Sequence, residues 1–179
     1  LNKSINARLR LDLRTACFGL LLRRYVSQGF KVQMIEVVSK GNLYEVLPLI
    51  RAYQEFYKVS EISDDRNAEF FSQFGESSPS GCQFIYRDAG NVAGFATVYL
   101  SFTSTITEKV AVLNDLYTLP NCRGKGIGRQ LIEHCRTYAA KNGAARLQWV
   151  TAPDNEQAQK LYESLNTGKS TWHFYTYNT

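Results

Sequence analysis

The stretch Val112-Leu-Asn-Asp-Leu-Tyr-Thr-Leu-Pro-Asn-Cys-Arg-Gly-Lys-Gly-Ile-Gly-Arg129 decides the fold of this chain. An apolar strand, predicted over Lys109–Tyr117, leads through a short loop directly into a helix predicted from Gly128 to about Lys141. Three glycines alternate with other residues in the loop, so bare backbone N–H groups gather at the start of the helix. Such an arrangement is typical of a phosphate or pyrophosphate site.

Two common phosphate-binding motifs do not fit this loop. The Walker pattern is absent, because Gly124-Lys125-Gly126 has neither its spacing nor its Ser/Thr. The dinucleotide pattern G-x-G-x-x-G also fails, since the glycines here read G-x-G-x-G. The remaining alternative is a glycine-rich helix start without a ligand, which leaves the specific string of residues 123–129 unexplained.

At these residues the chain resembles the GNAT superfamily of acetyl-coenzyme A-dependent N-acetyltransferases. The family motif Q/R-x-x-G-x-G/A follows a strand, and residues 123–128 match it in full. The resemblance extends over residues 34–179 and is strongest over residues 110–166. It implies an α/β (α+β) GNAT fold, in which a mixed, mostly antiparallel central sheet is splayed at the cofactor site and flanked by helices.

The resemblance also implies a cofactor, acetyl-coenzyme A, and the residues that bind it. The amides of the glycine loop would hold the coenzyme A pyrophosphate, and the strand end before it would lie along the pantetheine arm. The implied cofactor-binding residues are Leu116, Tyr117, Thr118, Arg123, Gly124, Lys125, Gly126, Ile127, Gly128, Arg129 and Asn155.

A second set of candidate site residues lies in the predicted helix Asp154–Leu165. Asp154 is expected to be its N-cap, with Gln157 completing a capping box. Asn155 and Tyr162 are seven residues apart and therefore share a face. From the residues alone, Tyr162 reads more readily as a core aromatic. The resemblance instead implies that Asn155 contacts the pantetheine and that Tyr162 protonates the leaving thiolate.

The acceptor side is less defined in the sequence. Asp115 is the main candidate for steering an amine, since similar polyamine and small-amine acetyltransferases carry an acid there. Their Glu-Asp pair is Asn114-Asp115 in this chain, and a strand-end residue that caps loop amides is the alternative for Asp115. Four acids between the first two helices are further candidates for lining the acceptor site: Glu55, Glu61, Asp64 and Asp65.

The complete predicted order is βααβββαβαβ from Met34. The first strand covers residues 34–38 and the first two helices cover residues 42–58 and 64–74. Strands over residues 82–86 and 92–102 form a hairpin, and short strands over residues 146–151 and 171–177 follow the central motif. The aromatic closing strand Thr171–Tyr177 is expected to be buried on both faces or to meet another chain. Because members of the family that the chain resembles are often dimers joined near this strand, the resemblance implies a homodimer.

Composition sets the broad class. With 179 residues, 44% of them hydrophobic and 21% charged, the chain reads as a single globular domain without a membrane-spanning run. Four scattered cysteines favour a reduced, cytoplasmic setting, and two histidines make a zinc site improbable, so no metal is expected.

The first 33 residues are set apart by their charge. Residues 1–33 have a net charge of +6 and the whole chain has +5, so residues 34–179 have a net charge of −1. Because the only methionine is Met34, residues 1–33 are expected to be a non-native or accessory extension to the domain 34–179. The alternative is a basic arm for targeting or nucleic acid, and without it nucleic-acid binding is not expected.

The functional expectation is acetyl transfer from acetyl-coenzyme A to a primary amine of a small molecule, such as a polyamine or amino acid. Asp115 and Tyr162 are the candidate catalytic residues. Two alternatives remain open: an acetyl-coenzyme A-binding sensor without catalysis, and acetylation of a protein amine. Neither the acceptor nor a general base can be assigned from these residues.

Overall fold

A computed structural model of the chain describes residues 33–177 and 179, in two compact units. The main unit comprises residues 35–86 and 92–179. The elements in chain order are β1 (Gln33–Val37), α2 (Leu43–Phe56), α3 (Asp64–Phe71), β2 (Gly81–Asp88), β3 (Asn91–Thr103), β4 (Glu108–Thr118), a 3-10 turn (Pro120–Cys122), α4 (Ile127–Lys141), β5 (Leu147–Gln148) and α5 (Glu156–Glu163).

One five-stranded sheet orders its strands β1-β2-β3-β4-β5. Strands β3 and β4 are antiparallel, whereas β4 and β5 are parallel and pair only through Ala111–Leu147 and Val112–Gln148. Beyond Val112 the two strands separate, so the outer edge of β4 is open along its last residues. The predicted fold class, a mixed sheet that is splayed beside the glycine loop, is confirmed.

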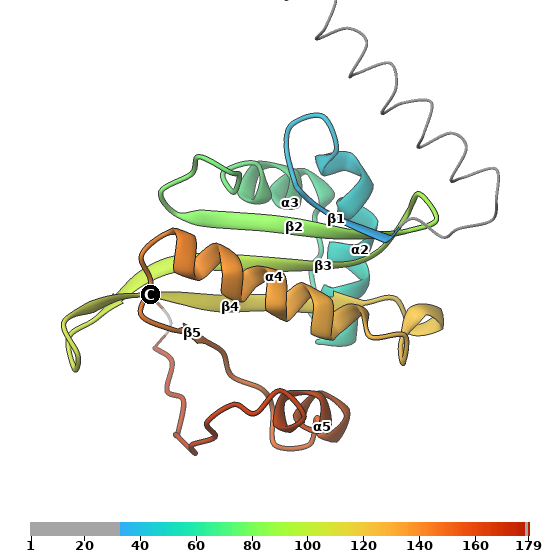
Figure 1. Ribbon diagram of the computed structural model, residues 1–179. Helices are drawn as coiled ribbons and strands as arrows, with labels where there is room; N and C mark the ends of the chain where they lie inside the picture. The colour runs from blue at the N-terminus through green and yellow to red at the C-terminus, as the bar shows by residue number, and fades with distance from the viewer. Residues whose placement is uncertain (1–32, 178) are drawn as a thin grey trace, which may run out of the picture. The chain divides into compact units, whose positions relative to one another are not determined.

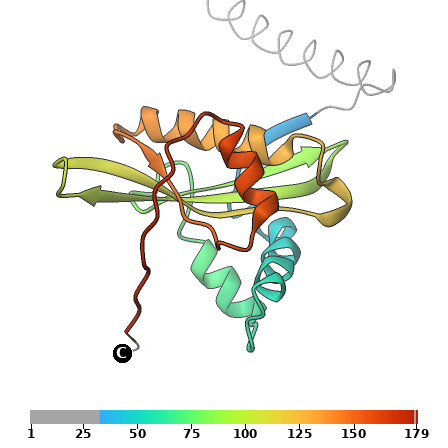
Figure 2. The same ribbon diagram turned by 90° about the horizontal axis from the view of Figure 1, so that it is seen from below.

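Each face of the sheet carries its own hydrophobic core, because side chains alternate along the strands. Helix α4 lies over one face, α2 and α3 lie over the other, and α5 lies beside the β5 edge of the sheet (Figures 1 and 2). The α4 face buries Phe84, Val98, Leu113, Leu131 and Cys135, among others. The opposite face buries Ile50, Phe71, Ile85, Phe95 and Tyr117, among others.

A bulge interrupts the alternation in β4. Thr97 pairs with Asp115 while Val98 pairs with Leu113, so Asn114 is an extra residue in the strand. As a result Asn114 and Asp115 lie together: the Asn114 amide donates to Tyr99 Oη at 3.1 Å and to Asp115 Oδ1 at 3.0 Å. The bulge thus adds a polar group at the point where Asp115 meets the helices α2 and α3.

Three local predictions are wrong. Residues 171–177 form no strand, since they pair with no strand of the sheet, and their aromatic side chains are exposed. The strand expected over residues 146–151 is only Leu147–Gln148. The cap of the last helix is Asn155 and not Asp154, since the Asn155 side chain accepts the Ala158 N–H at 3.2 Å.

The described part of the second unit comprises residues 33–34 and 87–91. Ala89 and Gly90 have φ of 52° and 86°, which is the left-handed pair typical of a tight hairpin turn. The Arg87 guanidinium donates to the Gly90 carbonyl at 3.2 Å and closes it. The predicted extension over residues 1–33 lies, apart from Gln33, outside the described residues.

Candidate active site

The open edge of β4 is formed by the residues predicted to contact the cofactor. Leu116 packs against the core on the α4 face, and Tyr117 is buried in the core on the α2 face. These two side chains therefore pack in the hydrophobic cores, and only backbone groups of β4 lie at its open edge. The Leu119 N–H donates to Ala93 in β3, so by alternation the polar backbone groups of Leu116 and Thr118 point away from β3.

The glycine loop has the geometry of an anion site. Gly124 and Gly126 adopt left-handed φ of 77° and 78°, and a Cβ added at either position would meet nothing within 4 Å. None of the backbone amides of residues 124–129 donates a hydrogen bond to another described residue. Six consecutive free N–H groups at the positive end of α4 fit the pyrophosphate of a nucleotide cofactor.

Arg123 lies between the glycine loop and the end of α2. Its Nε donates to the Thr118 carbonyl at 3.1 Å, which occupies one group of the open β4 edge. Its guanidinium carbon lies 5.9 Å from the Phe56 ring centre and 5.8 Å from that of Tyr117, within the range of cation–π attraction. Arg123 therefore connects the loop, β4 and the end of α2.

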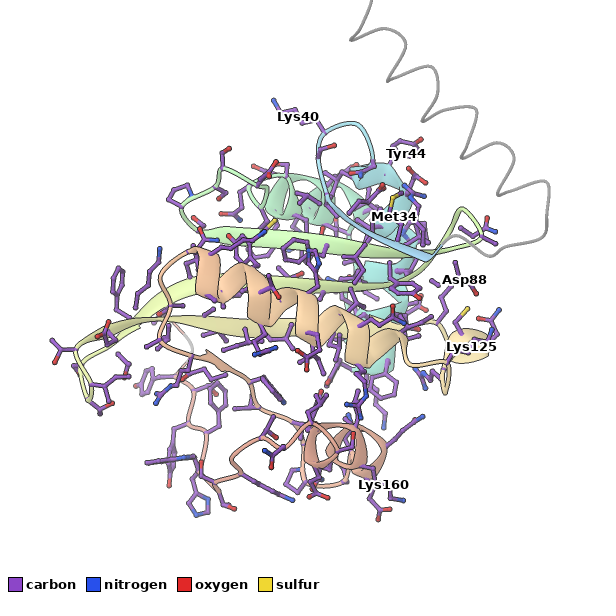
Figure 3. The ribbon with its side chains drawn as sticks, viewed as in Figure 1. Met34, Lys40, Tyr44, Asp88, Lys125 and Lys160 are labelled. Carbon is purple, nitrogen blue, oxygen red and sulfur yellow. The ribbon has the colours of Figure 1, made fainter. Side chains whose placement is uncertain are left out.

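The other two loop cations differ in their surroundings. Arg129 donates through Nη2 to the Ser164 carbonyl at 3.3 Å and to Ser164 Oγ at 2.7 Å, which ties the start of α4 to the end of α5. Lys125 is exposed on the loop and has no hydrogen bond or ion pair with any described residue (Figure 3). Of the predicted loop cations, Lys125 is thus the one whose side chain remains uncommitted.

Helix α5 carries Asn155 and Tyr162. Asn155 begins the helix as its N-cap, so its side-chain oxygen serves the helix itself. Tyr162 is half-buried and meets the Trp149 ring edge-on, with ring centres 5.3 Å apart. Burial, and to a lesser degree Tyr57, raises the pKa of Tyr162 to about 12. A phenol with that pKa stays protonated near neutral pH and can act as a proton donor.

A cavity of about 460 Å³ opens between α2, α3 and the bulge of β4. The sheet contributes Tyr99, Asn114 and Asp115 to its lining, and α2 contributes Ile50, Tyr53 and Gln54. The remaining lining residues come from α3 and the segment before it: Glu61, Ser63, Arg66, Asn67, Phe70 and Phe71. This cavity is of the size that holds a small molecule.

Asp115 is the most unusual group in this cavity. Its residue is only 6% exposed, and its buried Oδ2 accepts no well-formed hydrogen bond from a described residue. Burial raises the pKa of the Asp115 carboxyl, while the hydroxyls of Thr97 and Tyr53 and the Asn114 amide act in the opposite direction. Burial of the Tyr99 phenol, and to a lesser degree the nearby Asp115, raises the pKa of Tyr99 to about 12. A buried carboxyl with one oxygen that accepts no well-formed hydrogen bond is suited to a cationic ligand.

Of the four acids expected to line the acceptor site, one lines this cavity. Glu61 lines the cavity, whereas Asp64 forms an ion pair with Arg51 at 2.9 Å. Glu55 and Asp65 do not line the cavity. Sequence reasoning did not find Arg66 or Asn67, because no local pattern indicates that α3 packs beside the bulge of β4.

Within residues 33–177, no cluster of three or more acidic, histidine or cysteine residues could hold a metal ion. No helix among the described residues is long and apolar enough to pass through a membrane.

The described residues combine an anion loop with a splayed strand edge, the two features that the resemblance to GNAT N-acetyltransferases predicts. The chain belongs to the acetyltransferase (GNAT) family, whose sequence model matches residues 46–166. It is an N-acetyltransferase, and the predicted membership is confirmed.

Curated relatives support the same assignment. An uncharacterized N-acetyltransferase of Bacillus subtilis, YhfO, is 34% identical over 118 residues, which span 66% of this chain and 78% of YhfO. The thialysine N-epsilon-acetyltransferase of Bos taurus is 28% identical over 156 residues, or 80% of this chain and 91% of the bovine protein. Named small-molecule acetyltransferases are therefore among the relatives of this chain.

Solved structures show the same fold. The aminoglycoside N-acetyltransferase AAC(6')-Iy in complex with CoA has a TM-score of 0.69, with 83% of this chain and 96% of that chain covered. At 19% identity the likeness concerns the fold alone.

Proposed function

We propose that the protein transfers an acetyl group from acetyl-coenzyme A to a primary amine of a small molecule. The observation that carries the proposal is Asp115, which lines a small-molecule-sized cavity, is only 6% exposed and accepts no well-formed hydrogen bond at Oδ2 from a described residue. An ammonium group would supply the missing donor and the missing charge.

The residues of the donor side fit acetyl-coenzyme A. The free amides of residues 124–129 would hold its pyrophosphate, with Lys125 adding charge, and the backbone of Leu116 and Thr118 would hold its pantetheine arm. The cofactor would supply the activated acetyl thioester. Membership of the acetyltransferase (GNAT) family supports this choice of cofactor.

Groups of the chain itself would then bind the charged amine, stabilise the oxyanion and transfer protons. Asp115 would draw the amine to the end of the cavity, and because burial raises the pKa of Asp115 it is a better proton acceptor than an exposed carboxyl. The Leu116 N–H at the open edge would donate to the developing oxyanion. The Tyr162 phenol, protonated at neutral pH, would deliver its proton to the departing sulfur.

A thiol-release assay with polyamines, amino acids and aminoglycosides tests the proposal. We expect coenzyme A to be released with at least one small amine. Tight coenzyme A binding without turnover of any small amine would contradict the proposal and favour a sensor, whereas turnover with peptide amines alone would favour a protein acceptor.

Gly126→Ala is expected to raise the KM for acetyl-coenzyme A by about tenfold, because a methyl group would strain a left-handed residue and enter the anion site. The control is Gly143→Ala, at the other end of α4. Gly143 has a similar φ of 72° and equally open surroundings, so both variants should lose similar stability. An equal rise in KM for the two variants would show that the loop does not bind the cofactor.

We also propose that the protein is a homodimer that covers its C-terminal aromatics. Trp172, Phe174, Tyr175 and Tyr177 are 85%, 87%, 86% and 94% exposed, which is unusual for four large side chains in one short segment. Light scattering is expected to give twice the chain mass, and the double variant Trp172→Ser/Phe174→Ser is expected to give a monomer. A monomeric wild-type protein would overturn this proposal.

The compartment that we propose is the cytoplasm. Cys82, Cys122 and Cys135 are free thiols, as a reducing environment would keep them.

A further inference from the structure

The two groups proposed to transfer protons belong to different parts of the site. Asp115 lines the proposed amine cavity from β4, whereas Tyr162 lies on α5 against Trp149 and does not line that cavity. In the proposed reaction Asp115 takes up a proton and Tyr162 gives one up. Each turnover therefore leaves Asp115 protonated and Tyr162 ionised, unless a proton returns from one to the other.

Two tyrosines at the end of α2 lead from the cavity toward the outer end of that helix. Tyr53 lines the cavity, and Tyr57, one helical turn later, is the C-cap residue of α2. The two rings meet edge-on, with their centres 4.9 Å apart. Tyr57 is 52% exposed and does not line the cavity. The pair therefore joins the interior of the amine cavity to its outside.

The Tyr53 hydroxyl is close to both Asp115 and Tyr57. Burial is the main cause of the raised pKa of Tyr53, and both the charge of these two groups and hydrogen bonding with them add to it. Burial also raises the pKa of Asp115, and hydrogen bonding with Tyr53 is among the interactions that oppose this shift. The Tyr53 hydroxyl thus has the carboxyl on one side and the next tyrosine on the other.

The end of α2 that carries Tyr57 borders the donor side. Phe56 meets the Tyr57 ring edge-on with ring centres 5.2 Å apart, and the Arg123 guanidinium of the glycine loop lies 5.9 Å from the Phe56 ring centre. Burial is the main cause of the raised pKa of Tyr162, and Tyr57 is the one ionisable group among the described residues that adds to it. Tyr57 therefore lies near the phenol that would protonate the sulfur.

A series of hydroxyls between these groups would balance the protons of the reaction. The ammonium loses one proton to Asp115, and its nitrogen loses a second one to solvent once the C–N bond has formed. The C–S bond breaks, and the sulfur takes the proton of Tyr162. If Tyr57 then gives a proton to Tyr162, Tyr53 gives one to Tyr57 and Asp115 gives one to Tyr53, all four groups regain their starting states.

We propose that the hydroxyls of Tyr53 and Tyr57 form a relay that returns the proton held by Asp115 to Tyr162. This inference rests on the proposed function, since it connects the two groups to which that function assigns the proton transfers. The two tyrosines act through Asp115 and Tyr162 and need no contact with the reacting atoms.

Tyr57→Phe tests the relay, because it removes the hydroxyl and keeps the ring. We expect kcat to fall about tenfold, with KM for both substrates within about threefold of wild type. The solvent deuterium isotope effect on kcat is expected to increase, since return of the proton to Tyr162 becomes slow. Tyr53→Phe, which interrupts the relay at its other end, is expected to give a similar fall in kcat.

The same substitutions in the Tyr162→Phe protein distinguish a relay from a structural role. With no phenol left to reprotonate, loss of the Tyr57 or Tyr53 hydroxyl is expected to change kcat by less than about twofold. Tyr44→Phe is the control, since Tyr44 is a 68% exposed tyrosine in the first turn of α2 that does not line the cavity (Figure 3). It is expected to leave kcat and the isotope effect unchanged.

Three results would overturn the relay. The first is an unchanged kcat in Tyr57→Phe, and the second is a change confined to KM. The third is a fall in kcat that is equally large in the wild-type and Tyr162→Phe proteins. Failure of the underlying function differs from all three: the wild-type protein would then release no coenzyme A with any small amine. If Tyr162→Phe lowers kcat and Tyr57→Phe does not, the function stands and only the relay is wrong.

Discussion

Tyr162→Phe is expected to lower kcat at least about 100-fold and to leave the KM for acetyl-coenzyme A within about threefold of its wild-type value. The substitution removes only the hydroxyl, so the packing of the ring against Trp149 is retained. Because the pKa of Tyr162 is about 12, its phenol carries the proton across the neutral range and is a donor in the wild-type protein. Steady-state kinetics with both substrates varied would measure the two parameters.

Tyr138→Phe provides the matched control for this experiment. Tyr138 packs against the α4 core, its pKa is also raised to about 12 by burial, and its buried hydroxyl has no hydrogen-bond partner. Removal of that hydroxyl should leave kcat unchanged. If Tyr162→Phe behaves like Tyr138→Phe, then Tyr162 is a core aromatic and not a proton donor.

Asp115→Asn is expected to lower kcat/KM for the amine at least about 100-fold, since a buried partner of an ammonium group would be lost. Asp65→Asn, on an exposed residue of α3 that does not line the cavity, is the control and should have no effect. Unchanged amine kinetics in Asp115→Asn would show that Asp115 is a structural residue of the strand end.

The same substitution is expected to stabilise the free protein at neutral pH. The folded-state pKa of Asp115 is raised above its ordinary value of 3.8, so this carboxyl favours folding most below pH 3.8. That contribution is lost as the pH rises through the folded-state pKa, and the ionised, buried carboxylate then opposes folding. Asparagine does not ionise. The melting temperature of Asp115→Asn should therefore exceed that of wild type at pH 7, with a smaller difference at pH 4.

The features that were predicted well from the sequence are local. The glycine spacing of residues 123–128 requires left-handed turns at a helix start, and Gly124 and Gly126 adopt them. The alternation of apolar residues placed β3 and β4 correctly in outline. Errors of one residue, such as Asp154 in place of Asn155 as the cap, arise because both side chains can accept the same kind of hydrogen bond.

The features that were missed depend on contacts between distant segments. Alternating aromatics over residues 171–177 favour a strand, but a strand forms only when it pairs with another strand, and the local sequence does not show whether these residues pair. The bulge at Asn114 is set by its register against Thr97 and leaves no signature in the sequence. Arg66 belongs to the cavity only because the Gln54–Asn67 amide pair brings α3 against α2.

Arg123 contacts both the proposed donor site and a wall of the proposed amine cavity. The side chain lies between Phe56 of α2 and Tyr117 of β4, and its backbone is part of the loop that would receive the pyrophosphate. An anion that fixes the position of Arg123 would also fix the end of α2, which forms one wall of the proposed amine cavity. The two affinities are then thermodynamically linked, and any factor by which the acetyl donor tightens amine binding must equal the factor by which the amine tightens donor binding.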